Sequence, residues 1–506
     1  MSAAVLLAVL LCCTGCGVKS TATSTPVQQP PPNPPATSTT PILVTLTDDA
    51  TANGLVSFYV NISQVQITPR QGTASTLYAS GSTLEVTHLA GTTQYLASVG
   101  ISPASYKNIV ITLSDPLITY IDSTGATVTQ EFPAYTGTAE IDFAELLNVD
   151  TTPLEITLDF NLEKSVVLDP ITGNLTLTPV FTAQALPIAA TAPTIGTGLI
   201  EGVLGTVTQY GSGVLSLSTD VLQDTLSCSM TGSTVTVNYS ASAGLPPGSL
   251  VRVDLAAQPD SSIDCARIEA VNASNQAYAM SGTVNSYRGG TAPYQLTLVM
   301  QQGSGAGVSP VFVGDGINVN FDSPAATFAV DWDGISPVNL GFTPLFSAAT
   351  FFPGQYVEAS SNIPLLVSGN DVGAIPGSMI TVAAMDATKL TLSQQDEEGT
   401  VGNVTTDANG VTRFTLTLDP SSVFAQYTAL PIEPKGFVPS IQVVVPAVAT
   451  IDGSLTTTMV GAPIGSLPYA KVRGLLFLTG SSYTMVAQSV TASLAPVVTV
   501  TTPASP

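Results

Sequence analysis

The stretch Val56-Ser57-Phe58-Tyr59-Val60-Asn61-Ile62 shows the pattern that governs the whole chain. Apolar and polar residues alternate, and β-branched and aromatic side chains dominate, as is typical of a half-buried strand. The same pattern returns in Phe414-Thr415-Leu416-Thr417-Leu418, and Gly, Pro, Asn and Asp break such runs throughout. Helical spacing is nearly absent; one short turn over residues 143–147 is the possible exception. The sequence therefore predicts an all-β fold.

The net charge and the histidine content of the chain argue against several classes of function. The 506 residues carry 12 Lys and Arg against 35 Asp and Glu, which gives a formal net charge of −23. Binding of nucleic acid through its phosphates, or of anionic lipid through a polybasic patch, needs the opposite sign. The single histidine, His88, argues against a Ser-His-Asp triad or a multi-histidine zinc site. We expect no nucleic acid as a partner, no metal and no other cofactor.

The N-terminus has the features of an export signal. Residues 2–11 form an apolar run that is too short to span a bilayer but suits the core of a secretion signal. Cys12-Cys13-Thr14-Gly15-Cys16 follows, and Gly15 directly before Cys16 resembles the bacterial lipobox. That resemblance implies that Cys16 is lipidated and becomes the new N-terminus. We predict a lipoprotein signal peptide over residues 1–16; an ordinary signal peptide cut elsewhere is the alternative.

A tether is expected after the lipidated cysteine. Residues 17–41 are rich in Ser, Thr and Pro, a composition that buries nothing and favours an extended polyproline helix of about 3.1 Å per residue. We predict that this segment is disordered and that residues 495–506 form a flexible tail. No later window is apolar enough for a transmembrane helix. The expected location is the cell envelope, on a bacterial membrane reached through the lipid anchor, with the outer membrane favoured.

Cys228 and Cys265 are the cysteines that remain after the predicted cleavage. In an oxidising envelope compartment, two remaining cysteines most simply form a disulfide. They flank segments that the pattern predicts to be strands of one small domain. The alternatives are two free thiols, or a metal pair that would lack further ligands.

The first folded block, residues 42–187, carries an ordered set of short motifs. They are the opening Val44–Asp49, the turn 101–104 before the strand Tyr106–Leu113, the strand Leu158–Phe160 and the ending Leu175–Val180. In this order they resemble the bacterial lipoprotein family known as domain of unknown function 4382, over about residues 42–183. The resemblance implies a lipid-anchored envelope protein with a β-sandwich domain, and it brings no known activity or catalytic residue. We predict an antiparallel β-sandwich over 42–187.

A degenerate repeat follows. Gly-Thr-Val opens each copy, and the copies begin at Gly205, Gly282 and Gly399. A second signature, Pro-Gly then Val, comes later, at 247–253, 353–358 and, in altered form, 471–474. The set resembles the small β-barrel module known as domain of unknown function 5666. We predict three barrels, at residues 199–272, 279–392 and 397–494. Their opening and closing strands are expected to pair, with Val207 beside Ile268 and Val401 beside Val490 in shared cores.

Few residues suggest chemistry, and each has a structural alternative that we favour. Asp331-Trp332-Asp333-Gly334 is similar to the start of a calcium loop, but it lacks the further acidic ligand of that loop, and an Asp-Gly turn after a strand is the favoured explanation. Gly314-Asp315-Gly316 and the acidic run 396–399 have the same two interpretations. His88 could be a lone base or metal ligand, but a half-buried residue after a strand is more common.

Two further patterns also have a functional and a structural interpretation. Glu140 and Asp142 share one face of a predicted strand, where a glycosidase pair or two solvated carboxylates would fit. Trp332 is the single tryptophan, and with Tyr287 and Tyr294 it makes a weak aromatic face for binding carbohydrate.

These observations favour a lipid-anchored envelope protein without catalytic activity, a β-rich scaffold or binding module whose partner is an envelope protein or a glycan. The alternatives are a carbohydrate-binding or carbohydrate-active surface protein, with acids such as Glu140 or Asp331 in a cleft, and an adhesin. We predict no catalytic, cofactor-binding or metal-binding residues.

Overall fold

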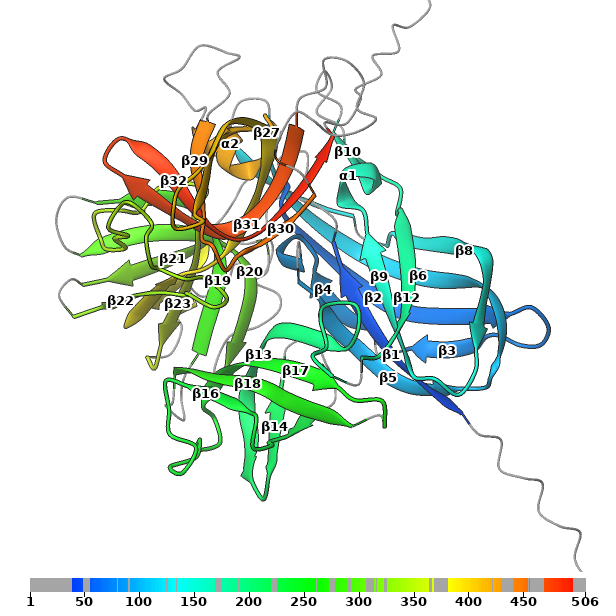
Figure 1. Ribbon diagram of the computed structural model, residues 1–506. Helices are drawn as coiled ribbons and strands as arrows, with labels where there is room; N and C mark the ends of the chain where they lie inside the picture. The colour runs from blue at the N-terminus through cyan, green and yellow to red at the C-terminus, as the bar shows by residue number, and fades with distance from the viewer. Residues whose placement is uncertain are drawn as a thin grey trace, which may run out of the picture. The chain divides into compact units, whose positions relative to one another are not determined.

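The computed structural model describes most of the chain between residues 39 and 494 (Figure 1). The described residues are 39–48, 55–79, 81–89, 92–122, 126–132, 134–168, 175–189, 191–219, 225–260, 262–272, 278–289, 293–305, 314, 316–322, 325–363, 366–367, 381–420, 422–428, 440–453, 455 and 468–494. Strands make up 65% of them and helices 3%, which confirms the predicted all-β fold. Cys16, residues 17–38 of the predicted tether and the tail lie outside these residues, whereas Thr40 and Pro41, which the prediction placed in the tether, begin the first strand.

The N-terminal part is a two-sheet sandwich, coloured blue to cyan in Figure 1. The first sheet contains, in spatial order, β12 (Phe181–Pro187), β9 (Leu154–Phe160), β1 (Thr40–Thr47) and β5 (Gln94–Ile101). The second contains β3 (Ser75–Tyr78), β2 (Leu55–Pro69), β6 (Ala104–Ile121) and β7 (Thr127–Glu131), with β4 (Ser82–Glu85) beside β2 and β8 (Thr136–Val149) beside β6. Short elements join them, namely η1 (Thr87–Leu89), α1 (Leu162–Ser165), β10 (Val166–Leu168) and β11 (Leu175–Leu177).

One hydrophobic core lies between the two sheets. Phe58 of β2 meets Phe160 of β9 edge to face at 5.2 Å, and Phe160 stacks on Phe181 at 4.2 Å between ring centroids. The sandwich differs from the prediction in one respect, because β1 and β9 run parallel, with Ile42 opposite Leu154. The predicted turn at 143–147 is also wrong: these residues lie in β8, since pairing with β6 outweighs weak local helix propensity.

Three smaller strand groups follow, which we name barrels 1, 2 and 3. Barrel 1 comprises β13 (Leu199–Gly211), β14 (Val214–Ser218), β15 (Leu226–Ser229), β16 (Val235–Val237), β17 (Leu250–Ala257) and β18 (Ile263–Asn272). Barrel 2 comprises β19 (Tyr278–Arg288), β20 (Tyr294–Gly305), β21 (Gly316–Phe321), β22 (Thr327–Val330), β23 (Tyr356–Ser361), β24 (Leu366–Val367), β25 (Thr381–Asp386) and β26 (Lys389–Leu392). Barrel 3 comprises β27 (Gln395–Thr406), β28 (Thr412–Leu418), α2 (Val423–Thr428), β29 (Ser440–Val445), β30 (Thr450–Asp452), β31 (Pro468–Thr479) and β32 (Ser482–Leu494).

All three barrels share one connectivity. The opening strand pairs with the second and the fourth strand, the second pairs with the third, and the fourth pairs with the fifth. The third strand lies parallel to the fifth: β15 beside β18, β21 beside β25, and β29 beside β32. A short additional strand in each barrel, β16, β22 or β30, also pairs in parallel with the fifth strand. In barrel 2 the fifth strand is split into β25 and β26. This is the connectivity of the OB-fold, a five-stranded Greek-key barrel.

The predicted pairing of opening and closing strands is therefore wrong. Both edges of the opening strand are already occupied by the second and fourth strands, so the fifth strand meets the third instead. A closed ring with an odd number of strands cannot alternate direction everywhere, and one neighbouring pair must be parallel. The expected cores are confirmed, because Val207 and Ile268 share one hydrophobic cluster and Val401 and Val490 share another.

The seam between the third and fifth strands differs in strength among the barrels. In barrel 3 three residue pairs join β29 to β32, whereas in barrel 1 Ser229 and Asp264 are the single pair that joins β15 to β18. Cys228 and Cys265, the residues directly next to that pair, form a disulfide with their Cα atoms 5.2 Å apart. The disulfide thus links β15 to β18, two strands that are otherwise joined by a single residue pair.

Replacing both cysteines by alanine should destabilise the full chain by about 3–4 kcal/mol, because the bridge closes a long loop in the unfolded state. Chemical denaturation followed by circular dichroism measures this loss. Adding a reductant to the wild type should reproduce it, while the double variant should not respond. Equal midpoints for the wild type and the double variant would contradict this role of the disulfide.

The glycine of the Gly-Thr-Val opening has a steric reason. A Cβ on Gly399 would lie 2.1 Å from the carbonyl oxygen of Thr417 on β28, and a Cβ on Gly282 would lie 2.0 Å from that of Val299 on β20. Backbone atoms of a paired strand cannot move aside as a flexible side chain can. The first two strands can therefore cross closely only where the opening residue has no side chain.

Gly399→Ala should destabilise the full chain by about 1–3 kcal/mol, the usual cost of overpacking. Gly402→Ala is the matched control on the same strand, because its added Cβ would lie 4.0 Å from the carbonyl oxygen of Thr415, an ordinary van der Waals distance. Thermal melts of both variants measure the difference. Similar melting temperatures for the two variants would contradict the steric explanation.

Candidate functional site

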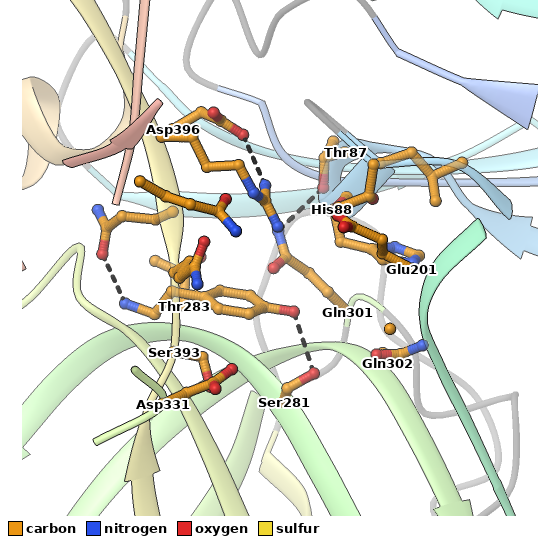
Figure 2. A pocket seen from close by; sticks show the side chains of 18 of the residues that line it. Thr87, His88, Glu201, Ser281, Thr283, Gln301, Gln302, Asp331, Ser393 and Asp396 are labelled. Atoms are coloured by element: carbon orange, nitrogen blue, oxygen red, sulfur yellow. Dashed lines mark hydrogen bonds and ion pairs between the residues drawn. The ribbon is translucent and has the colours of Figure 1, made fainter. Parts of the chain in front are cut away.

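Polar side chains from the sandwich and from all three barrels line one cavity of about 190 Å³, which we name the central cavity. In Figure 2, Asp396, Gln301, His88 and Ser281 lie around one space although they come from different parts of the chain. The charged lining residues are Glu201, Arg252, Asp254, Asp331, Asp333, Asp396, Glu397, Glu398, Lys471 and Arg473. In a chain with only 9% charged residues, this concentration marks the strongest candidate site.

The repeat itself brings two of these charges to the cavity lining and places a third beside it, as the ion-pair partner of Arg252. The residue after the Val (or Ala) of the second signature is Arg252 in barrel 1, Glu358 in barrel 2 and Lys471 in barrel 3. In each barrel this residue pairs with the residue that directly precedes the opening glycine, namely Leu204, Ser281 and Glu398. Equivalent positions of three copies therefore supply charges to one region.

Arg252 links barrel 1 to barrel 2. Its Nη2 hydrogen-bonds Glu358 Oε2, while its Nη1 lies 3.7 Å from Glu269 Oε2 and 3.9 Å from Asp331 Oδ2. Burial disfavours the charged guanidinium, but these carboxylates outweigh that effect and raise the pKa of Arg252. Losing one partner of such a buried pair leaves an uncompensated charge, which costs about 3–5 kcal/mol.

Arg267 extends this network to the Asp331-Trp332-Asp333-Gly334 turn. Its Nη2 lies 2.8 Å from Glu269 Oε2, and its Nη1 lies 3.3 Å from Asp333 Oδ2. The carboxylates that suggested a calcium loop are thus paired with arginines. Gly334, with φ of 66°, lies in a turn closed by a hydrogen bond from Ile335 N to Trp332 O. In the described part of the chain, no group of three or more His, Cys, Asp or Glu residues is placed to hold a metal ion.

Barrel 3 supplies the acidic wall. Asp396 Oδ2 lies 3.1 Å from Arg473 Nη1, and Glu397 Oε1 accepts a hydrogen bond of 2.9 Å from Gln395 Nε2. Gln395 Oε1 in turn accepts from the backbone N–H of Tyr356 in barrel 2 at 2.9 Å. Polar contacts therefore hold the acidic wall against barrel 2.

Burial changes the protonation of several lining acids. It raises the pKa of Glu397 to about 8, that of Glu398 to about 7 and that of Asp254 to about 6. The backbone N–H of Gly202, 2.8 Å from Asp254 Oδ1, opposes the last of these shifts. At neutral pH the cavity lining therefore contains protonated as well as ionised carboxyl groups.

The sandwich closes another side of the cavity with η1. His88 Nδ1 lies 2.9 Å from Glu85 Oε2, and Glu85 also accepts hydrogen bonds from Thr87 and from Phe58 N. Gln301 of barrel 2 reaches across and donates to Thr87 Oγ1 at 2.9 Å and to the Val56 carbonyl oxygen. His88 therefore lines the cavity and is held in place by Glu85. It follows strand β4 and is partly buried, which agrees with the structural interpretation that we favoured.

The other predicted candidates lie elsewhere. Glu140 and Asp142 are exposed on β8, outside the lining of the central cavity, so Glu140 does not supply the cleft acid of the enzymatic alternative. Asp331 does line the cavity. Asp315 falls outside the described residues. Trp332 stacks on Phe477 at 5.8 Å, and Tyr294 stacks on Phe321 at 5.5 Å, so these aromatic rings pack against the core around barrel 2 rather than forming an open row.

Sequence reasoning missed the gathering of these residues. The sequence pattern places the acidic run 396–399 at a repeat boundary and Asp331 and Asp333 in a turn. It gives no reason to group Arg252, Glu201 and Gln301 with them. One available signal was the charged residue that follows the second signature in every copy. Its repetition in a chain so poor in charge indicates a shared task.

The family model described as "Domain of unknown function (DUF4382)" matches residues 39–179. This confirms the resemblance inferred for the first block, and the matched segment extends from just before β1 through β11 of the sandwich. No curated protein matches the chain. Among the described residues, no helix has both the length and the apolar character needed to cross a bilayer.

The raised pKa values predict how stability depends on pH. In the unfolded chain Glu397 titrates near the usual value of about 4.3, so between about pH 5 and pH 8 the folded state binds more protons than the unfolded state. Stability is then fully present at the acidic end and is lost as pH rises. The melting temperature should fall over this range, and Glu397→Gln should reduce the fall.

The control is Asp407→Asn, which removes an acid on the β27–β28 turn whose Oδ2 lies 2.8 Å from Arg413 Nη1. A hydrogen bond from Arg413 lowers the pKa of Asp407, so that group is ionised in both folded and unfolded states across the tested range. Its variant should keep the wild-type slope. A Glu397→Gln slope as steep as that of the wild type would contradict the assignment.

Proposed function

We propose that this chain is a lipid-anchored protein of the bacterial cell envelope that binds a ligand or partner and does not catalyse a reaction. The sandwich and the three barrels act as its scaffold, and the central cavity is its binding site. The observation that carries the binding role is the convergence of polar groups from four strand assemblies on one cavity. The lipobox-like Gly15-Cys16 and the Ser/Thr/Pro-rich segment after it support the anchored location.

Several polar side chains in and around the cavity are held in place by hydrogen bonds and ion pairs, which supports a binding role over a catalytic one. The Nδ1 atom of His88 is engaged by Glu85, and both arginines of the barrel 1 network are held by carboxylates. Tyr356, whose hydroxyl lies 3.0 Å from Ser281 Oγ, has its pKa raised by burial to about 12, so it keeps its proton at physiological pH. Groups held in this way suit recognition of a fixed ligand shape better than proton transfer.

Carbohydrate binding is a second candidate, favoured by the connectivity of the barrels. OB-fold barrels commonly bind oligonucleotides or oligosaccharides across their second and third strands and the adjoining loops. The net charge of −23 disfavours an oligonucleotide, which leaves a glycan as the polymer to test. We also propose that the three barrels are related copies of the module resembling domain of unknown function 5666.

Metabolic labelling with a fatty-acid probe tests the anchor. The wild type should be labelled and recovered in the membrane fraction, and Cys16→Ala should be neither, because two or more acyl chains are needed for stable anchoring. Cys13→Ala is the matched control, since it changes a neighbouring cysteine and should retain the label. Equal labelling of wild type and Cys16→Ala would refute lipidation at Cys16.

A glycan array and a pulldown from envelope extract, both with the full chain, test the binding role. Retention of a defined glycan or envelope protein would support it. Hydrolysis or transfer of an array glycan during the assay would contradict the non-catalytic role.

A further inference from the structure

One contact between the sandwich and barrel 2 places a threonine hydroxyl against a glutamine carboxamide at the wall of the central cavity. Gln301 Nε2 on β20 lies 2.9 Å from Thr87 Oγ1 on η1 (Figure 2). Thr87 is 4% exposed and Gln301 is 6% exposed. The two residues lie 214 positions apart in the sequence, so only folding brings them together.

A carboxylate lies on the other side of the same hydroxyl. Thr87 Oγ1 donates a hydrogen bond of 2.7 Å to Glu85 Oε1, which also accepts from the backbone N–H of Phe58 at 2.8 Å and from that of Thr87 at 3.2 Å. Glu85 Oε2 lies 2.9 Å from His88 Nδ1. The carbonyl oxygen of Val56, 3.4 Å from Thr87 Oγ1, is the weaker acceptor for the hydroxyl proton. Glu85 is therefore held where a general base for this hydroxyl would lie.

The carboxamide of Gln301 is held at one of its two polar atoms. Nε2 donates to Thr87 and to the carbonyl oxygen of Val56, whereas Oε1 has no hydrogen-bond partner in the described part of the chain. The last side-chain torsion of glutamine has a broad energy profile. Rotation about it can present the face of Cδ to Thr87 Oγ1. Because both groups belong to one folded chain, the attack is intramolecular, which can be worth an effective concentration of about 10⁵ M or more.

We propose that Thr87 and Gln301 form an ester that joins the sandwich covalently to barrel 2. Thr87 Oγ1 attacks Gln301 Cδ, and the hydroxyl proton passes to Glu85 Oε1. The tetrahedral intermediate then breaks its Cδ–Nε2 bond, and Glu85 returns the proton to the nitrogen, which leaves as ammonia. One C–O bond replaces one C–N bond, and no oxidant, metal or second reactant is consumed.

The surroundings suit both the formation and the survival of this bond. Thr87 and Gln301 line the central cavity, whose volume of about 190 Å³ gives ammonia room to leave. Glu85 is 5% exposed, and the low exposure of all three side chains limits the water that would hydrolyse the ester. The bond forms once in each chain, so it is a self-modification without turnover and is compatible with a non-catalytic binding protein.

A second threonine–glutamine contact provides an internal control. Gln442 Nε2 lies 3.2 Å from Thr415 Oγ1 in barrel 3, but Gln442 is exposed. Among the described residues, no carboxylate lies at hydrogen-bond distance from the Thr415 hydroxyl. This pair lacks the base and the shelter from water, and we expect it to remain unlinked.

Mass spectrometry of the full chain tests the proposal. The folded wild type is incubated at neutral pH, denatured and cleaved with trypsin, which yields segment 71–107 with Thr87 and segment 289–389 with Gln301. The two segments should be recovered as one joined species that has lost one ammonia at the junction. Hydroxylamine, which cleaves esters but not ordinary amides, should separate them. Recovery of the two segments only as separate peptides would overturn the proposal, and so would a joined species that resists hydroxylamine.

Matched variants assign the reacting groups. Thr87→Val and Gln301→Met should each abolish the joined species, and Glu85→Gln should slow its formation about a hundredfold or more. Thr415→Val should form it as the wild type does. Circular dichroism melts establish which variants fold, and the wild-type peptides decide the matter even where a variant does not. A joined species in folded Thr87→Val, or formation at the wild-type rate in folded Glu85→Gln, would overturn the assignment.

Discussion

Unpaired strand edges are the constraint on which this structure depends. Strands dominate the described chain, and charged residues, which ordinarily protect exposed edges, make up only 9% of the sequence. In barrels 1 and 3 the third strand runs parallel to the fifth and pairs with it, which closes a ring of five, while in barrel 2 the two halves of a split fifth strand, β25 and β26, pair with the third and the fourth strand. The close crossing at Gly282 and Gly399, and the disulfide across the seam of barrel 1, are local consequences of that closure.

The scarcity of charged residues in the chain also makes the central cavity distinctive. Of the 12 Lys and Arg and 35 Asp and Glu residues in the chain, ten line the cavity where sandwich and barrels meet. Burying Arg252 and Glu358 together costs desolvation free energy that their mutual attraction must offset, so apolar residues would join the barrels at least as well. The free energy of folding alone therefore does not explain why this junction is polar.

Apolar contacts hold the assembly around this polar centre. Barrels 2 and 3 share one hydrophobic cluster that joins Phe346 to Phe477, and Leu43 of the sandwich packs into the core of barrel 1. Gln355 of barrel 2 adds a hydrogen bond of 3.2 Å to the carbonyl oxygen of Leu476. The cavity walls are therefore positioned by packing outside the cavity, and its polar groups need not form every possible contact with one another.

The sequence by itself determined the all-β class, the sandwich-family match and the residues that share barrel cores, because strand periodicity and turn residues are local signals. Val207 and Ile268 could be assigned to one core from their pattern alone. Only the tertiary structure decided which strand edges meet. That pairing depends on whether a closed ring has an odd or an even number of strands, which no single stretch of sequence reveals. It also decided the site: Glu397, Gln301 and Arg252 look like ordinary strand residues in isolation, and only long-range packing brings them to one cavity.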